Sequence, residues 1–296
     1  DAIPFPDRDA IQLEEYLRVW KRLHGMGSVS LICARGCPYT CTWCSRSVYG
    51  DTHRRRTVKN VVDEIELIRE RYSPDMLWFA DDVFTMHHSW FRQFYEEMKR
   101  RNLRIPFECI SRADRLTGEI LRNMADIGCF RIWYGSESGS QRILDAMERR
   151  VSVGEIRTIT NLARECGIKA GLFVMLGYPG EEIGDIEATV EHLKQTNPDT
   201  FLTTVAYPIK GTKFYSRVEG GIEAPADWAS VTDRHLRFAG RYSDRFYWFA
   251  NRYLVNEVKQ YRIRREGGRA GKSIVRFAST FAKAKLARAG MELMKG

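Results

Sequence analysis

The sequence lacks any long uninterrupted run of apolar residues, and this absence excludes the class of proteins that cross a bilayer as helices. A transmembrane helix needs roughly 18 consecutive apolar residues, and no stretch of the 296-residue chain approaches that length. The amino terminus, which begins Asp1-Ala-Ile-Pro, also lacks the features of a secretory signal peptide. The sequence therefore predicts a cytoplasmic protein.

Paired cysteine motifs are scarce as well. The 7 cysteines include a single C-x2-C unit and no second clustered set. Structural zinc sites more often combine two such units, and a disulfide framework is typical of small secreted domains. A zinc knuckle would need a fourth ligand such as Cys33 or His53. Cys109, Cys129 and Cys166 stand alone, so we expect them to be small buried side chains.

What the sequence does contain is a group of three closely spaced cysteines. Cys37, Cys41 and Cys44 are separated by three and then two residues, in a loop after the apolar run 29–34. Cysteine thiolates hold iron–sulfur clusters, usually four per cluster, so a set of three predicts a four-iron cluster with one iron open to another ligand. An open coordination position is a property of catalytic metal sites.

The motif Cys-x3-Cys-x2-Cys, with Trp43 just before the last cysteine, resembles the cluster motif of the radical S-adenosylmethionine (SAM) superfamily. The surrounding Arg-Gly-Cys-Pro-Tyr-Thr-Cys is similar to the branch that carries a cobalamin-binding domain before the radical domain. The likeness extends from about residue 2 to residue 215. It implies a [4Fe-4S] cluster on Cys37, Cys41 and Cys44, with S-adenosyl-L-methionine bound at the fourth iron. Cobalamin is expected through a domain outside this chain.

Apolar runs alternate with helical periods along most of the chain. We expect strands at residues 29–34, 76–80, 107–110, 130–134, 170–176 and 201–206. Such repeats imply right-handed crossovers and a parallel sheet, and the resemblance narrows this α/β fold to a (β/α)6 partial TIM barrel. Helix caps are expected at Thr57, Ser89, Thr117 and Ser152, the last in a capping box with Glu155. The adjacent His87 and His88 are interpreted as helix-start residues.

Three regions follow from these patterns. Residues 1–24 are expected to form a Pro-restricted linker and a first helix, at the junction to a missing cobalamin-binding domain. Residues 25–215 are expected to form the radical SAM core. Residues 216–296 are expected to form a basic helical extension, with a break at Gly267-Gly268.

Polar residues end several expected strands, and in barrels the chemistry lies at the carboxyl ends of the strands. Each one alone could be an ordinary turn residue. The resemblance assigns Asp81 and Asp82 to the methionine amino group, and Glu137, followed by Ser138, to the ribose or amino group. It assigns residues 171–181, which include Gly177, to the adenine side, and Trp43 is a candidate cover for the adenine face.

The methionine carboxylate is expected to bind an arginine, because a guanidinium matches a carboxylate bidentately. Arg112 follows the third core strand and is the candidate that we select. Arg35, next to the cluster motif, is a competing candidate, so the sequence leaves this choice open.

The resemblance implies that the cofactor is cleaved reductively to methionine and a 5′-deoxyadenosyl radical, with flavodoxin or ferredoxin as a reductant. Methyl transfer to an unactivated carbon is the first expected reaction, with ring cyclisation or rearrangement as the second expectation, and the expected substrate is a small molecule or lipid-like. A tRNA-modifying enzyme resembling the methylthiotransferases is an alternative. A non-enzymatic metal-binding scaffold is a second alternative, against which the polar strand ends argue.

The net charge of +9 is concentrated at one end of the chain. Residues 241–296 contain 14 Lys and Arg residues against 4 Asp and Glu residues, so the preceding part is close to neutral. This basic segment predicts contact with an anionic membrane surface or an acidic partner domain, ahead of nucleic acid. Its aromatic residues between 242 and 253 predict a helix packed on the open side of the barrel, with base stacking as the alternative.

Overall fold

The computed structural model describes residues 1–44, 50, 52–223, 232, 234, 236–266 and 272–295. The chain divides into two compact units. Unit 1 comprises Asp1–Pro38, Val48–Gly135 and Ile159–Gly171, and unit 2 comprises Tyr39–Ser47, Ser136–Thr158 and Leu172–Gly296. The expected division of the chain at residues 25 and 216 stays a prediction. The expected break at Gly267-Gly268 lies outside the described residues.

Six strands form the central sheet in the order β1-β4-β5-β6-β7-β8. Their bounds are β1 Ser28–Leu31, β4 Met76–Phe79, β5 Phe107–Ser111, β6 Cys129–Glu137, β7 Lys169–Leu176 and β8 Thr200–Val205. The pairs β1–β4, β4–β5 and β5–β6 are parallel. Every expected strand is therefore present, and the predicted α/β fold with a parallel sheet is confirmed.

The first expected strand is shorter than predicted. The run 29–34 ends as a sheet strand at Leu31, and Ala34–Arg35 instead forms β2, which pairs antiparallel with β3 Arg54–Arg55. The cause is a side chain from another strand end: Asp81 Oδ1 accepts hydrogen bonds from the backbone N–H groups of Cys33 and Ala34, at 2.7 and 3.1 Å. These bonds turn the chain away from the sheet.

Unit 1 contains the helices α1 Leu13–His24, α2 Val58–Tyr72, α3 His88–Arg100 and α4 Gly118–Asp126, and the short η1 Arg8–Ala10 and η2 Ala113–Arg115. Thr57 and Thr117 cap α2 and α4 as predicted. Each side chain accepts a hydrogen bond from the backbone N–H three residues later in the chain. The predicted cap at Ser89 is wrong: α3 begins at His88, so its cap position is His87, two residues before Ser89. His87 and His88 thus start the helix, as expected.

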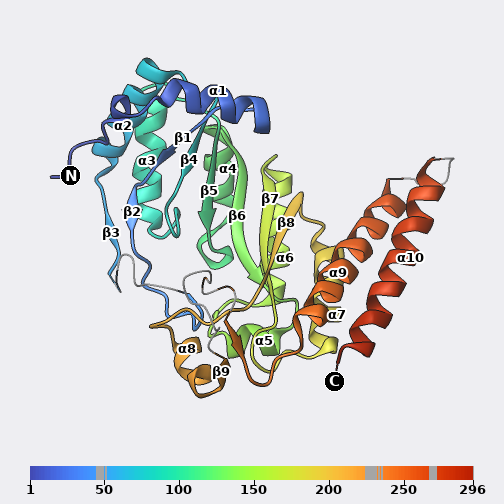
Figure 1. The fold of residues 1–296 in the computed structure, drawn as a ribbon. Coiled ribbons are helices and arrows are strands. Elements are labelled where there is room, and N and C mark those ends of the chain that lie inside the picture. Colours follow the sequence, from blue (N-terminus) through green and yellow to red (C-terminus); the bar gives the residue numbers. More distant parts are fainter. Residues whose placement is uncertain are drawn as a thin grey trace. The chain divides into compact units, whose positions relative to one another are not determined.

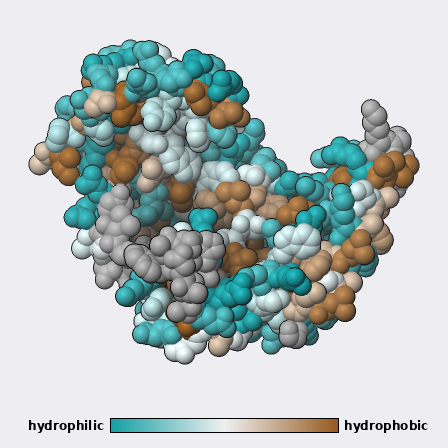
Figure 2. Space-filling model, viewed as in Figure 1, coloured by the Kyte–Doolittle hydropathy of each residue, from teal (hydrophilic) through white to brown (hydrophobic). Residues whose placement is uncertain are grey.

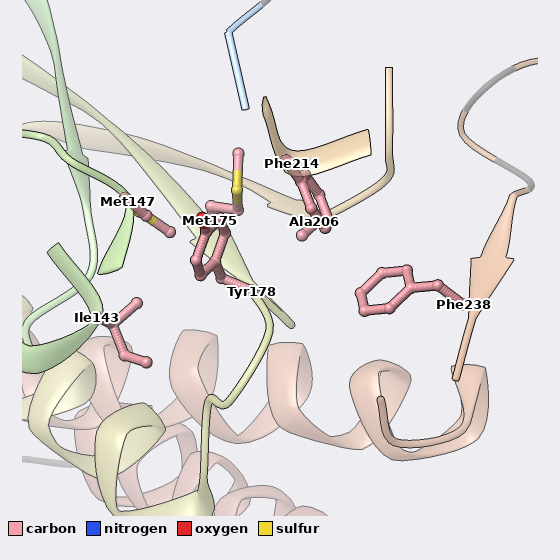
Figure 3. Close-up of a cluster of buried hydrophobic side chains, with 7 residues drawn as sticks. All are labelled: Ile143, Met147, Met175, Tyr178, Ala206, Phe214 and Phe238. Atoms are coloured by element: carbon pink, nitrogen blue, oxygen red, sulfur yellow. The ribbon is translucent and has the colours of Figure 1, made fainter. Parts of the chain in front are cut away.

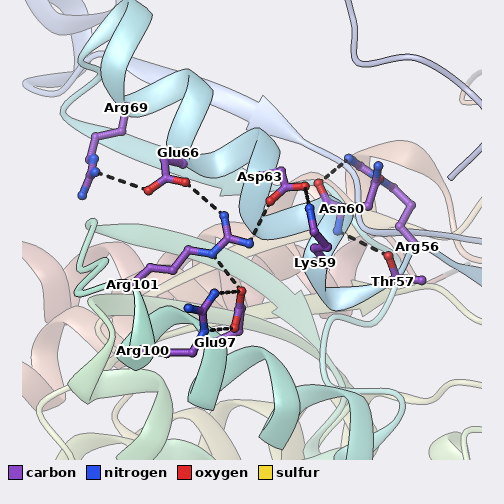
Figure 4. Close-up of polar contacts among 10 residues, drawn as sticks. All are labelled: Arg56, Thr57, Lys59, Asn60, Asp63, Glu66, Arg69, Glu97, Arg100 and Arg101. Carbon is purple, nitrogen blue, oxygen red and sulfur yellow. Dashed lines mark hydrogen bonds and ion pairs between the residues drawn. The ribbon is translucent and has the colours of Figure 1, made fainter.

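Helices α2 and α3 pack side by side next to the strands of unit 1 (Figure 1). The Arg101 guanidinium, just after α3, joins them by ion pairs to Asp63 and Glu66 of α2 and to Glu97 of α3, at 2.8 to 3.0 Å (Figure 4). The first of these contacts, with Asp63, helps raise the pKa of Arg101. Because three carboxylates converge on one half-buried side chain, the network fixes the two helices better than isolated surface pairs would.

Unit 2 contains α5 Gln141–Ala146, α7 Ile183–Thr196, α8 Lys213–Val218, α9 Asp244–Arg265 and α10 Lys272–Leu293, with η3 Glu219–Gly221 and a ribbon of β9 Ile222–Glu223 and β10 Arg237–Phe238. Helix α6 Val153–Glu165 begins here and ends in unit 1. Its predicted capping box is present: the Ser152 N–H donates to Glu155 Oε2, and the Glu155 N–H donates to Ser152 Oγ.

The aromatic helix α9 packs against α7 and α10, and α9 and α10 run as a hairpin (Figure 1). The Thr203 hydroxyl of β8 donates a hydrogen bond to Asn251 Oδ1 of α9, at 2.9 Å. Phe246 and Tyr247 are buried, so they serve packing and are not displayed for base stacking. Among the described residues, no helix combines the length and apolar composition needed to cross a bilayer. A cytoplasmic location stays a prediction.

Candidate functional site

The middle of the cysteine loop is anchored by Thr42, which is fully buried in unit 2. Its N–H donates to Met147 O at 3.1 Å, its hydroxyl lies 2.6 Å from the Tyr178 hydroxyl, and its carbonyl accepts from Phe214 N at 2.9 Å. Three bonds to three separate segments hold the backbone beside Cys41. This arrangement fixes where the neighbouring thiol and Trp43 can lie.

The anchor rests on a cluster of buried hydrophobic side chains (Figure 3). Met147 and Tyr178, which bond Thr42, belong to this cluster, and Trp43 packs against it. Its members are Ile143, Met147, Met175, Tyr178, Ala206, Phe214 and Phe238. This apolar packing therefore helps to position the cysteine loop.

Arg149 is a candidate site residue that the sequence analysis did not select. Its side chain is buried, yet its guanidinium faces three predicted site residues of unit 2. Nη1 lies 3.9 Å from Cys41 Sγ, Nε lies 3.8 Å from Glu137 Oε1, and Cζ lies 6.0 Å from the Trp43 ring centre. An N–H donor beside a sulfur and a carboxylate is suited to a site that binds an anion.

Glu137 lies at the last position of β6 with a backbone φ of 54°. This left-handed conformation is uncommon for a residue other than glycine and is often associated with functional sites. Gly139 follows, and a Cβ there would lie 2.4 Å from Ala188 O, so only glycine fits. The Ser138 hydroxyl is buried and lies 3.2 Å from the Thr189 hydroxyl. Ser138 therefore supports the turn, whereas Glu137 is the residue placed beside Arg149.

Asp81 and Asp82 differ sharply in environment within unit 1. Asp81 is buried, bonds two backbone amides, and forms an ion pair with Arg55 at 3.2 Å. Burial raises its pKa to about 6, because the desolvation cost exceeds the stabilisation from Arg55. Asp82 keeps an exposed side chain, although the protein around it removes part of its solvent; this partial desolvation raises its pKa, and a hydrogen bond from the Gly36 amide opposes the rise. Asp82 therefore accepts a hydrogen bond from Gly36, which precedes Cys37, whereas Asp81 holds the backbone between β1 and β2 through its bonds to Cys33 and Ala34.

The two arginine candidates of the sequence also differ. The Arg112 side chain is buried, and its Nε pairs with Asp114 at 2.8 Å in unit 1. Arg35 is exposed at the end of β2. The structure thus ties Arg112 to a neighbouring carboxylate, and it adds Arg149 as a third candidate.

The turn after β7 is built on Gly177 and Glu181. Gly177 has a φ of 80°, and its N–H donates to Glu181 Oε2 at 2.6 Å. Burial raises the pKa of Glu181 to about 8. A Cβ at Gly177 would lie 2.8 Å from Cζ of Tyr247. The aromatic ring of α9 therefore packs directly on this backbone, which requires glycine.

The model of the radical SAM superfamily matches residues 31–193, more than half of the chain. The chain belongs to the radical SAM superfamily. An uncharacterized methyltransferase of Pyrococcus horikoshii is 26% identical over 234 residues, covering 78% of this chain and 50% of the relative. The anaerobic magnesium-protoporphyrin IX monomethyl ester cyclase of Rubrivivax gelatinosus is 29% identical over 168 residues, covering 56% and 30%. The chain thus spans half or less of the length of these relatives.

The solved structures agree on the fold. A radical SAM methyltransferase of Kitasatospora setae, with cobalamin and a [4Fe-4S] cluster bound, aligns with a TM-score of 0.67 at 16% identity. The alignment covers 93% of this chain and 52% of that chain. At this identity the likeness shows the fold alone, which supports the predicted partial barrel.

Membership in the radical SAM superfamily implies a [4Fe-4S] cluster and S-adenosylmethionine, and the cysteine loop fits the cluster. Cys37 and Cys41 are half-buried and Cys44 is exposed. In the described part of the chain, no three Cys, His or carboxylate side chains converge on one metal-ion position, as a zinc site would require. A four-iron cluster does not require the thiolates to converge on one position, since each thiolate binds its own iron. The Arg149 donor beside Cys41 also suits a cluster sulfur.

Proposed function

We propose that this chain is the catalytic core of a cobalamin-associated radical SAM enzyme that methylates, or closes a ring at, an unactivated carbon. The observation that carries the proposal is Arg149, whose buried guanidinium faces Cys41, Trp43 and Glu137 together. Relatives named as a methyltransferase and as a cyclase support the reaction class. Residues 25–215 are the proposed core and residues 216–296 the proposed extension.

The proposed roles are assigned residue by residue. Cys37, Cys41 and Cys44 hold the cluster. Arg149 binds the methionine carboxylate in preference to Arg112, because Arg112 Nε lies 2.8 Å from Asp114, whereas the Glu137 carboxylate lies 3.8 Å from Arg149 Nε and Arg149 Nη1 faces Cys41. Asp82 and Glu137 accept hydrogen bonds from the amino group and the ribose. The adenine is bound by the Gly177 backbone and covered by the ring of Trp43. Asp81 is a positioning residue that holds the backbone before the cysteine loop.

When bound and reduced, the cluster supplies the electron that cleaves S-adenosylmethionine to methionine and a 5′-deoxyadenosyl radical. The residues of the chain itself position that cofactor and exclude water from the radical. The buried Thr42 anchor and the hydrophobic cluster beneath Trp43 hold one side of the proposed site rigid. A flavodoxin or ferredoxin is the proposed reductant, and a small molecule is the proposed substrate.

Anaerobic reconstitution of the chain tests the proposal. We expect about four irons and four sulfides per chain, and 5′-deoxyadenosine when dithionite and S-adenosylmethionine are added. Cys41→Ala should lose both the cluster and the product, whereas the control Cys166→Ala, outside the motif, should keep both. Stoichiometric zinc without iron uptake, or an intact cluster without any 5′-deoxyadenosine, would contradict it.

The cobalamin branch is tested by the coding sequence preceding residue 1, which should encode an Asp-x-His-x-x-Gly stretch.

We also propose that helix α10 binds an anionic membrane surface. Large hydrophobic side chains are exposed along it, and Figure 2 shows such residues on its surface among polar ones. They are Ile274, Val275, Phe281, Leu286 and Leu293, which are 45 to 80% exposed. Lys283 and Lys285 lie among them on the same helix. Exposed apolar side chains beside cations are typical of helices that lie in the membrane interface.

A further inference from the structure

Unit 2 contains a cavity of about 390 Å³ that none of the proposed cofactor residues lines. One wall comes from the carboxyl ends of β7 and β8, at Leu176 and at residues 203–206, and the other from the start of α9, at Tyr247, Trp248 and Asn251. Strand β8 is the last in the sheet order. In barrel enzymes, substrates are bound at the carboxyl ends of the strands, so the position is that of a substrate site.

The cavity is strongly cationic. Among the described residues that line it, three are arginines, at positions 234, 237 and 241, and one is a carboxylate, Asp244. Asp244 is shared: Oδ1 bonds Arg241 at 2.7 Å, and Oδ2 pairs with Arg237 at 2.5 Å. Within this described lining, one carboxylate does not balance three guanidinium groups, so the described lining has an excess of positive charge for a ligand. Guanidinium groups match carboxylate and phosphate oxygens in particular.

The innermost arginine is held in place before any ligand arrives. The Arg241 side chain is only 9% exposed. Its guanidinium carbon lies 5.2 Å from the Tyr247 ring centre and 5.6 Å from that of Phe238, within the range of cation–π attraction. A preorganised guanidinium loses little side-chain entropy on binding an anion.

The rim of the cavity offers a flat apolar surface. The Trp248 side chain is 53% exposed, and the Arg252 guanidinium carbon lies 4.2 Å from its ring centre. An exposed indole is costly in water but suits stacking against a planar ligand. The lining hydroxyls of Thr203 and Thr204 supply hydrogen-bonding groups nearby. Ligand sites commonly combine apolar walls with a few convergent polar groups in this way.

The cavity shares a wall with the proposed cofactor turn. Tyr247 lines the cavity, and the same ring packs on Gly177, where a Cβ would lie 2.8 Å from it. Leu176, which immediately precedes Gly177, lines the cavity too. A ligand in the cavity is therefore separated from the proposed adenine-binding backbone by one side chain.

We propose that this cavity binds the substrate, and that the substrate is an organic anion with a planar apolar part. Its carboxylate or phosphate group binds Arg241 and Arg237, and its planar part stacks on Trp248. The identification as a substrate site rests on the proposed radical SAM function, whereas anion binding by the cavity does not depend on the cluster.

Calorimetry with phenyl phosphate on the reconstituted chain tests the proposal. Inorganic phosphate probes the arginines alone, and benzyl alcohol probes the apolar surface at Trp248 alone. Phenyl phosphate should bind, inorganic phosphate should bind more weakly, and benzyl alcohol should bind weakest. Arg241→Gln should weaken phenyl phosphate binding roughly 10- to 100-fold, the effect of losing a hydrogen bond to a charged group. Arg245→Gln is the matched control, because Arg245 is exposed on α9 and does not line the cavity.

Two further variants keep the test decisive if Arg241→Gln fails to fold. Arg237 is largely exposed, so Arg237→Gln should fold and still weaken both phosphate probes. Trp248→Ala should weaken phenyl phosphate but leave inorganic phosphate unchanged. Equal phenyl phosphate affinity in the Arg237→Gln, Arg241→Gln and Arg245→Gln variants, or benzyl alcohol binding as tightly as phenyl phosphate, would overturn the anion site.

The two proposals fail separately. If the cluster assembles and 5′-deoxyadenosine forms while the arginine variants bind phenyl phosphate normally, the cavity proposal is overturned and the radical SAM function stands. If arginine-dependent binding is found without cluster assembly, the cavity remains an anion site and its role as a radical substrate site is overturned.

Discussion

Arg149 Nη1 lies 3.9 Å from Cys41 Sγ, which places a buried guanidinium next to a proposed cluster ligand. The same side chain reaches Glu137, with Nε 3.8 Å from Oε1. Cys41 and Arg149 are far apart in sequence, and the Thr42–Met147 bonds bring their segments together. One side chain can therefore influence both the electronic properties of the cluster and the binding of the cofactor.

Replacing Arg149 with Gln should change two quantities at once. Affinity for S-adenosylmethionine should fall by about 1–3 kcal/mol, the cost of leaving polar partners unpaired. The midpoint potential of the cluster should also fall, because a hydrogen bond to a cluster sulfur stabilises the more negative reduced form. Calorimetry and redox titration followed by electron paramagnetic resonance measure the two effects.

Arg150→Gln is the control for this prediction, because Arg150 is adjacent but exposed. Iron content should be unchanged in both variants. A normal potential together with normal affinity in Arg149→Gln would show that this guanidinium has only a structural role.

The adjacent carboxylates after β4 should respond differently to the same substitution. Asp81→Asn should lower the free energy of unfolding by about 3 kcal/mol, because the buried Arg55 loses its counter-charge. Asp82→Asn should leave stability and iron content unchanged and weaken S-adenosylmethionine binding by about 1–3 kcal/mol. Urea denaturation and calorimetry separate the two outcomes. Weakened binding in Asp81→Asn at full stability, with normal binding in Asp82→Asn, would reverse the assignment.

Glu181 should make stability depend on pH. Burial raises its pKa from 4.5 to about 8, so the folded state binds a proton that the unfolded state releases. The stabilisation is complete below pH 4.5 and is lost as pH rises through 8. Glu181→Gln cannot ionise, so by pH 9 it should be more stable than the parent chain by at least about 1.4 kcal/mol, the value of one pKa unit.

Thermal and urea unfolding between pH 5 and pH 9 test the Glu181 prediction. Glu191→Gln, on the exposed face of α7, is the control and should follow the parent profile. Parallel profiles for the parent and Glu181→Gln would mean that this carboxylate is ionised in the folded protein at neutral pH.

Helix α10 should bind anionic vesicles through its exposed hydrophobic side chains. The double variant Phe281→Ser and Leu286→Ser should lose much of the binding to phosphatidylglycerol vesicles, and salt should weaken the parent, because exposed charges are screened over about 10 Å at 0.1 M. Ala282→Ser is the control, since it is exposed but removes little apolar area. Sedimentation measures the bound fraction. A chain that ignores these vesicles at low salt but binds tRNA tightly would favour the tRNA-modifying alternative.

Local patterns were sufficient for much of the fold. The core strands and the caps at Thr57, Thr117 and Ser152 depend on neighbours in sequence, so their residues could be read directly. The cap at Ser89 was predicted wrongly because nothing local distinguishes it from a residue one position inside the helix. The cysteine motif needed no tertiary information, since its three thiols lie on one loop.

The sequence by itself thus determined the superfamily, the parallel sheet and the proposed cluster ligands, because short-range spacing encodes each of them. Only the tertiary structure decided which of many arginines approaches Cys41, since that depends on packing between segments more than 100 residues apart. It also decided that Asp81 accepts hydrogen bonds from backbone amides while Asp82 is exposed. The sequence could not predict this difference, because the two side chains are identical and adjacent. The arginine-lined cavity has the same origin: β7, β8 and α9 form it only after the chain has folded.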